Sequence, residues 1–321
     1  MSEDAFDPSL QLVEDEVTHP DLAAAMWTNP GEIAGNSKDD DDNGDAPDLT
    51  LLLLLLLLQV THPDLAAAMW TNPREVAGNR RDDDGNGYVD DANGFDFVSR
   101  DGRGRQQRPG RAGVCQSGLK MISAKFIGRR GGSLSDAVLA LNYLLDLKTR
   151  YNLNLVATSN SWGSGGYAQS FNAISAHNTA GILFVAAAGN DARNTELSIS
   201  YPAGYDLPNI ISVGSITSTG AISSFSNVGA ISVDLFAPGS SILSTWPVNS
   251  YASISGTSMA TPHVTGAVAL YAAAHRQLRG SWPTAAQIKA AVMDMGVYDA
   301  AYDQSVSKKR LNVGLLINSL R

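Results

Sequence analysis

The sequence has little of what several protein classes depend on. Among its 321 residues there is one cysteine, Cys115, so an internal disulfide scaffold is excluded. The longest apolar run is the eight leucines of residues 51–58, whereas a membrane-spanning helix needs roughly twenty apolar residues. The hydrophobic fraction, 44%, is ordinary and excludes a wholly disordered chain. We therefore expect a folded core and no membrane span.

Basic residues are scarce at the N-terminal end. Residues 1–50 contain fourteen acidic side chains and one basic side chain, Lys38, while the whole chain carries a net charge of -9. The acidity therefore belongs to this end of the chain, and it gives no support to a nucleic-acid partner. Residues 1–16 are acidic and do not resemble a signal peptide, so the sequence leaves the compartment open.

One near-perfect repeat lies in the N-terminal third. Residues 17–36 and 60–79 match at eighteen of twenty positions, with the leucine run between them. Two copies are too few for a solenoid, which needs about three or more stacked units, so we interpret the repeat as a local duplication. The sequence predicts a poorly ordered acidic extension over residues 1–59 and one folded domain over residues 60–321.

An arginine- and glycine-rich stretch, residues 99–111, interrupts the predicted domain. It contains five arginines and predicts a flexible joint. From residue 112 onward the pattern is regular, with Ser133 and Asp136 forming the start of a capping box. Apolar runs predict strands over 120–127, 153–158, 182–187, 210–213, 233–236 and 242–245, and helical spacing predicts helices over 133–150, 167–179, 257–278 and 284–294.

This alternation predicts an α/β fold with a mainly parallel sheet covered by helices on both faces. Ligands of such sheets bind where loops leave the carboxyl ends of the strands. The predicted loops at that edge include residues 160–166, 189–193 and 255–258.

A serine lies at the start of the longest predicted helix. Ser258 follows Gly256 and Thr257 in the segment ISGTSMATPHVTG, which begins at Ile254. A helix N-terminus offers backbone N–H groups and a partial positive charge, which favour an alkoxide or a tetrahedral oxyanion. The alternative interpretation is that Ser258 only caps the helix.

The segment GTSMATPHVTG resembles the nucleophile motif of the subtilisin-like serine proteases, or subtilases (peptidase S8). Phe184–Asp191, FVAAAGND, resembles the family segment that supplies an asparagine to the oxyanion hole, and Ser159–Ser164, SNSWGS, resembles the strand that lines the substrate pocket. The resemblance implies a three-layer α/β/α sandwich and a serine endopeptidase that acts on peptides or proteins as a monomer. It implies catalytic roles for Ser258 and Asn190 and substrate binding by Ser161, Trp162, Gly163, Ala188 and Gly189.

The family's acid motif is missing. Subtilases carry their residues in the order Asp, His, Ser, with the Asp in a D-[ST]-G turn seven residues before the His of an HPDL segment. Here that position holds Leu12 before His19 and Leu55 before His62. Asp15 and its neighbour Glu14 are nearby acids, but they lack the glycine of the turn.

The family's histidine motif is also missing. The resemblance places an HGTH segment where the joint of residues 99–111 lies, and the joint contains no histidine. His19 and His62 belong to the HPDL segments, and His177, His263 and His275 lie on predicted helices. Without a general base, the Ser258 hydroxyl keeps its proton, so we expect a very poor protease.

Two histories would explain this chain. It is a pseudoprotease that binds peptides in the same groove, or it derives from an active protease gene through an error of splicing or assembly. The clustering of the repeat, the leucine run and the missing motif within the first 111 residues favours the second history. A product that does not function at all is a further alternative.

The segment DDDGNGYVDD, residues 82–91, places oxygen donors at alternating positions around glycines. Asp82, Asp84, Asn86 and Asp90 are of the type that calcium prefers, and subtilases are frequently calcium-stabilised. No glutamate closes the loop at its twelfth position, so a solvated acidic turn is the alternative. The loop is thus a candidate structural calcium site, with the solvated turn left open, and we expect no cofactor for catalysis.

Overall fold

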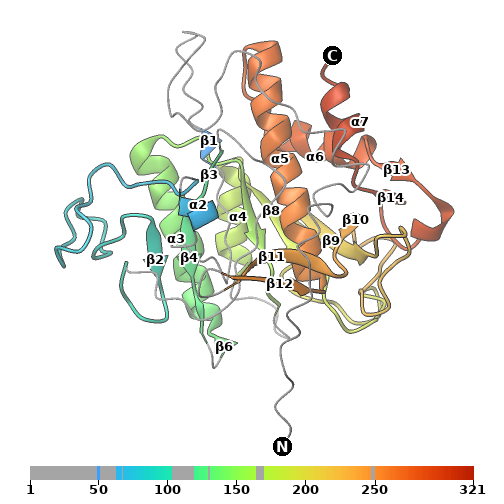
Figure 1. Ribbon diagram of the computed structural model, residues 1–321, viewed down its shortest axis with the longest axis horizontal. Helices are drawn as coiled ribbons and strands as arrows, with labels where there is room; N and C mark the ends of the chain where they lie inside the picture. The colour runs from blue at the N-terminus through green and yellow to red at the C-terminus, as the bar shows by residue number, and fades with distance from the viewer. Residues whose placement is uncertain are drawn as a thin grey trace, which may run out of the picture.

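The computed structural model describes residues 49–50, 63–66, 68–102, 119–128, 131–163, 170–246 and 250–321 (Figure 1). Several predictions fall outside these residues: the extension over 1–59 apart from 49–50, most of the joint at 99–111, Cys115, His19 and His62.

The central sheet contains six strands in the order β13-β14-β10-β9-β8-β7. All neighbouring pairs are parallel except β13 with β14. The strands are β7 (Ala157–Asn160), β8 (Leu183–Ala187), β9 (Ile210–Ile216), β10 (Leu235–Pro238), β13 (Val297–Tyr298) and β14 (Lys309–Arg310). The predicted mainly parallel sheet is therefore confirmed.

Four two-stranded pairs accompany this sheet in the described part of the chain. Two are parallel: β1 (Leu49–Thr50) with β3 (Leu119–Lys120), and β2 (Gly94–Asp96) with β4 (Ser123–Lys125). Two are antiparallel: β5 (Ile127–Gly128) with β6 (Gly131–Gly132), and β11 (Ile242–Trp246) with β12 (Ser250–Ile254). The β11–β12 hairpin leads directly into the longest helix, so it lies at the N-terminal end of that helix (Figure 1).

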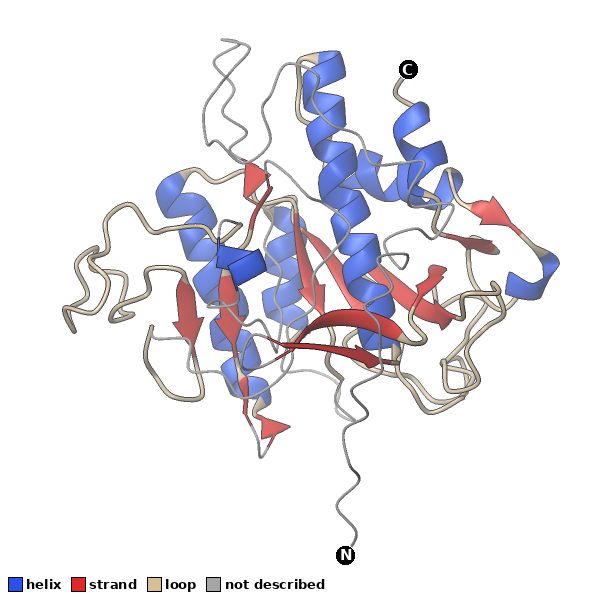
Figure 2. Ribbon diagram, in the orientation of Figure 1, coloured by secondary structure: helices blue, strands red, loops and turns tan. Residues whose placement is uncertain are grey.

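Helices cover both faces of the sheet (Figure 2). One core contains α5 (Thr257–Arg279), α6 (Ala285–Asp294) and α7 (Val313–Asn318), and the other contains α3 (Leu134–Tyr151) and α4 (Phe171–Thr179). Successive side chains of β8 point to opposite faces of the sheet. Leu183 and Val185 therefore pack in the first core, and Phe184 and Ala186 pack in the second. The short helix α2 (Pro63–Ala66) adds Leu65 to the first core, and η2 (Ala300–Tyr302) adds Tyr302 to a small third cluster.

Side-chain caps fix the starts of α3, α6 and α7 among the described α-helices, with Asn312 capping α7. The Ser133 hydroxyl accepts a hydrogen bond from the Asp136 N–H at the start of α3, as the sequence predicts. Thr284 and Gln287 form a reciprocal capping box at the start of α6. Among the described residues, no helix combines the length and the hydropathy that a bilayer span requires.

Candidate functional site

The first turn of α5 carries Ser258 to the carboxyl edge of the sheet. The chain reaches it through Gly256, whose N–H donates to the Gly239 carbonyl over 2.8 Å and whose carbonyl accepts from the Met259 N–H over 2.9 Å. The first bond ties the start of α5 to Gly239, the residue after β10, and the second closes the first turn of α5. Ser258 is half-buried, so its side chain is within reach of a ligand at the surface.

Asn190 lies beside this helix start, in the loop that follows β8. Its Oδ1 accepts from the Thr257 N–H over 2.8 Å and from the Thr257 hydroxyl over 3.0 Å. The Thr257 hydroxyl also accepts from the Gly189 N–H over 3.2 Å. Because the amide oxygen is engaged twice, the Nδ2 group is the side of Asn190 that can donate to a ligand. Asn190 is itself exposed, which such a role requires.

The predicted catalytic residues, Ser258 and Asn190, therefore meet at the N-terminus of α5, joined through Thr257. Sequence reasoning does not assign a role to Thr257, which is fully buried. The one feature of the sequence that could have indicated a role for Thr257 is its position directly before Ser258.

The predicted substrate-binding residues surround the same edge. The Ser161 hydroxyl donates to the Ser258 carbonyl over 3.0 Å, which links the end of β7 to the first turn of α5. The Trp162 ring is buried and packs edge-on against Phe126, with Nε1 donating to Asn160 Oδ1 over 3.2 Å. Gly163 is exposed. Trp162 therefore presents its main chain to any ligand and not its ring.

Ala188 and Gly189 continue from β8 toward Asn190. Ala188 is buried and its N–H donates to the Val213 carbonyl over 3.0 Å. Gly189 has φ +107°, a conformation that favours glycine, and it turns the chain toward Thr257.

Three histidines fall within the described residues. His177 is buried on α4, and its Nε2 donates to the Leu141 carbonyl of α3 over 2.9 Å. His263 engages the Met259 carbonyl through Nδ1 over 2.8 Å, and His275 engages the Ser281 carbonyl over 2.8 Å. His263 follows Ser258 by five residues, so on α5 it lies about 140° around the helix from the serine.

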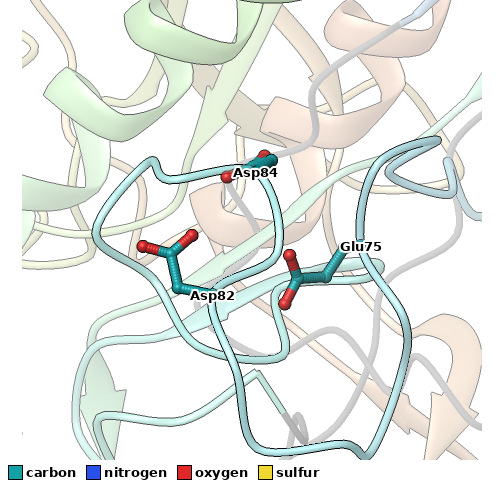
Figure 3. Close-up of side chains that lie close together, drawn as sticks. All are labelled: Glu75, Asp82 and Asp84. Carbon is teal, nitrogen blue, oxygen red and sulfur yellow. The ribbon is translucent and has the colours of Figure 1, made fainter.

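A separate acidic loop follows α2. One carboxylate oxygen from each of Glu75, Asp82 and Asp84 lies within 4.8 Å of the others. Figure 3 shows Asp82 and Asp84 on one turn with Glu75 across from them. Calcium–oxygen distances are about 2.3–2.6 Å, so oxygens with this spacing can share one ion. Sequence reasoning identifies Asp82 and Asp84 but misses Glu75, which precedes Asp82 by seven residues.

The three clustered carboxylates and the other predicted ligands of this loop all accept hydrogen bonds from the protein. Asn86 Oδ1 accepts from the Tyr88 N–H over 2.7 Å, and the Asp90 carboxylate accepts from the Arg80 N–H over 3.0 Å. The role of all four predicted residues as metal ligands stays a prediction, and two of them, Asp82 and Asp84, lie together with Glu75.

Burial and hydrogen bonds act on these carboxyls in opposite directions. Burial raises the pKa of Glu75. Burial also acts to raise the pKa of Asp84, but hydrogen bonds from Asn72, Tyr151 and Asn86 outweigh it, so the pKa of Asp84 is lowered. Asp84 is therefore a carboxylate at neutral pH.

Comparison with known proteins decides the family. The sequence model described as the Subtilase family matches residues 57–307. The chain belongs to the subtilase family. The predicted family and the subtilisin-like α/β fold are both confirmed.

Curated relatives agree with this assignment. The chain is 47% identical over 146 residues to an alkaline proteinase of Hapsidospora chrysogena, covering 43% of this chain and 35% of that protein. It is 41% identical over 157 residues to a cuticle-degrading protease of Metarhizium anisopliae, covering 48% and 39%. It is 35% identical over 164 residues to subtilisin DY of Bacillus licheniformis, covering 51% and 57%. These matches thus span between about a third and three-fifths of each relative.

A solved structure shares the fold of this subtilase. The crystal structure of a cold adapted subtilisin-like serine proteinase superposes with a TM-score of 0.60 at 24% sequence identity, covering 91% of this chain and 96% of that one. At this identity the likeness concerns the fold alone.

Proposed function

We propose that this subtilase binds an extended peptide or protein at the N-terminus of α5 and accepts its acyl group on Ser258, with very slow turnover. Asn190 Nδ2 and the Ser258 N–H would hold the oxyanion. The observation that carries the proposal is the double hydrogen bond from Thr257 to Asn190 Oδ1, which directs the amide donor away from Thr257. Donors fixed in advance are the main source of oxyanion stabilisation.

The substrate would lie beside Ser258 in extended form. The main chain of Ser161–Gly163 follows the last residue of β7, and strand addition to such an edge uses backbone hydrogen bonds rather than particular side chains. The burial of the Trp162 ring supports this interpretation, because it leaves only main-chain groups for the peptide. Ala188 and Gly189 would form the opposite wall.

The slow turnover follows from the missing base. Neither the stretch at 99–111 nor any other position supplies the family's HGTH segment. Of the histidines that the structure describes, His177 is buried on α4 against the Leu141 carbonyl, and His275 lies seventeen residues after Ser258 on α5 and engages the Ser281 carbonyl. His263 projects from a different side of α5. In subtilisin itself, loss of the base lowers turnover about a million-fold and leaves roughly a thousand-fold over water. We expect losses of that order here.

A fluorophosphonate probe tests the proposal. We expect slow labelling at Ser258, detected by mass spectrometry over hours at high probe concentration, and none in Ser258→Ala. Rapid labelling would reveal a working general base and overturn the slow turnover. Labelling of the Ser258→Ala variant to the same extent would show that this serine is not the nucleophile.

A second candidate is peptide binding without chemistry, which the missing base favours. This candidate function uses the same groove. It predicts that a peptide binds the protein, as measured by fluorescence anisotropy, and that the fluorophosphonate probe leaves Ser258 unmodified.

We also propose that the acidic loop binds calcium through Glu75, Asp82 and Asp84, with Asn86 and Asp90 nearby. Three hard oxygen donors within 4.8 Å of one another support this. An ion bound only to the folded state would stabilise it by about 2.7 kcal/mol at a hundred times its Kd.

Thermal unfolding with calcium or a chelator tests this site. We expect a midpoint several degrees higher in millimolar calcium than in chelator, with the difference abolished in Asp84→Ala. The exposed Asp206 lies outside the loop, so Asp206→Ala is a matched control that keeps the difference. Equal midpoints with calcium and chelator would contradict the proposal.

A further inference from the structure

One buried side chain holds the loop that carries Asn190. Asn227 Nδ2 donates to the Ala188 carbonyl over 2.9 Å, and the Asn227 N–H donates to the Gly189 carbonyl over 2.9 Å. Asn227 Oδ1 accepts from the N–H groups of Asp191 and Arg193, both over 3.0 Å. Four backbone groups of the loop, two on each side of Asn190, are therefore bound to a single residue.

Asn227 is close-packed in this position. It is 2% exposed, and a Cβ atom added to Gly189 would lie 2.3 Å from Asn227 Nδ2. The asparagine thus occupies space that only a glycine at position 189 leaves open.

Asn227 is in turn fixed to the central sheet. The Ser226 hydroxyl donates to the Asn227 carbonyl over 2.9 Å and accepts from the Ser215 N–H of β9 over 2.9 Å. Ser215, Ser226 and Asn227 are all buried. The loop is therefore connected through Asn227 and Ser226 to a strand of the central sheet.

We propose that Asn227 is a positioning residue that fixes Asn190 for binding of a tetrahedral anion on Ser258. The inference deepens the proposed function and rests on it. The hydrogen bonds of the Asn227 side chain go to the backbone on both sides of Asn190, so it acts through that backbone. Thr257 fixes the amide oxygen of Asn190 from one side, and Asn227 fixes its main chain from the other.

Because Asn227 fixes the main chain around Asn190, its loss should weaken binding of the tetrahedral anion in particular. When Asn227 is shortened, the loop groups lose their side-chain partner and Asn190 moves relative to Ser258. Misplacement of a catalytic group by about 1 Å can cost on the order of a hundred-fold. The loss falls on the charged tetrahedral species, because a peptide with an intact planar carbonyl places little charge on Asn190.

A pair of ligands measures this difference directly. A peptide boronic acid adds the Ser258 hydroxyl oxygen to boron, releases the serine proton to the buffer and forms a tetrahedral borate anion. The peptide amide of the same sequence binds the groove without that bond. We expect Asn227→Ala to weaken boronic-acid binding about ten- to a hundred-fold and amide binding less than about two-fold.

Asn209 provides a matched control. It is also 2% exposed, and its Nδ2 donates to the carbonyls of Ile174 and Ile182 at the opposite edge of the sheet. Asn209→Ala should destabilise the fold to a similar degree and leave the ratio of the two affinities unchanged. If Asn227→Ala does not fold, Asn227→Asp serves, because it keeps the volume and the acceptor but removes the donor to Ala188.

A double-mutant cycle separates positioning from general destabilisation. In an Asn190→Ala background, Asn227→Ala should cause no further loss of boronic-acid binding, because the group that it positions is gone. Equal losses in both backgrounds, or an unchanged affinity ratio in Asn227→Ala, would overturn the inference and leave the proposed function intact. A parent protein that binds boronic acid no better than amide would overturn the proposed function, and the inference with it.

Discussion

At the residue scale, the central feature is the position of Thr257, which directly precedes Ser258 in the chain and is hydrogen-bonded to Asn190, the two residues predicted to be catalytic. Its hydroxyl donates to Asn190 Oδ1 and accepts from the Gly189 N–H, while its own N–H also donates to Asn190. One residue therefore sets the orientation of the amide and the start of the helix that carries Ser258. Such a contact converts a flexible exposed amide into a fixed donor.

Removing the Thr257 hydroxyl should slow acylation of Ser258. We expect Thr257→Val to lower the fluorophosphonate labelling rate about ten-fold, since loss of one oxyanion donor costs about 10²–10³-fold in subtilisin and misorientation costs less. Thr257→Ser keeps the hydroxyl and should label at the parental rate. The mass-spectrometric time course decides, and a Thr257→Val rate equal to the parental rate would contradict this role.

The sequence predicts a role for residues that lie within a contiguous motif. It misses residues that are defined by a contact with a distant part of the chain. Ser258 and Asn190 lie in contiguous motifs, so the sequence alone is enough to predict a role for each, and both roles stay predictions. Asn227 acts on a loop more than thirty residues away, and nothing in its immediate neighbours reports that contact. Glu75 is missed for a related reason, because its approach to Asp82 depends on how the chain folds between them.

At the scale of elements, apolar runs locate most strands and helices with small shifts. The strand predicted over 153–158 is β7, Ala157–Asn160, because Leu155 and Val156 already pack in the two cores before the strand pairing begins. The hairpin strand β12, Ser250–Ile254, is not predicted, since three of its five residues are serine, tyrosine and serine on a half-exposed face. Helix α7 is only six residues long, which is too short for a periodic signal.

The capping box of α6 gives a prediction at this scale. Thr284→Ala removes the side-chain oxygen that accepts from the Gln287 N–H and should lower the free energy of unfolding by about 1 kcal/mol. Urea denaturation measures this directly. Thr284→Ser keeps the cap and should stay within a few tenths of a kcal/mol of the parent, whereas equal losses in both variants would argue against the cap.

At the scale of the whole molecule, His177 links stability to pH. Burial, with a smaller contribution from Lys148, lowers the pKa of His177 from 6.5 to about 4 despite its hydrogen bond to Leu141. Between these values the unfolded chain binds a proton that the folded protein does not bind. Stability from this group is therefore complete above pH 6.5 and falls as the pH drops toward 4, by about 3 kcal/mol in total.

Substitution of His177 tests this linkage. His177→Gln keeps a donor for the Leu141 carbonyl and removes the titration, so its unfolding free energy should fall less between about pH 7 and pH 4 than that of the parent. Parallel curves for the parent and His177→Gln would show that this histidine does not contribute.

The fold of the whole molecule is predictable because its parallel α/β pattern and its motifs agree. What the sequence cannot supply is the geometry that joins separate loops at one edge of the sheet. From that geometry and the missing HGTH segment together, we infer that this subtilase keeps the oxyanion donors, Asn190 Nδ2 and the Ser258 N–H, at the N-terminus of α5. We also infer that it lacks the general base that turnover needs.

Casein cleavage by the purified chain, compared with its Ser258→Ala variant, tests that claim most directly. We predict that the two proteins release peptides at rates that an ordinary assay does not separate, because turnover through Ser258 is slowed about a million-fold. Steady cleavage by the parent that disappears in Ser258→Ala would contradict the claim, because it would require a proton acceptor at the serine.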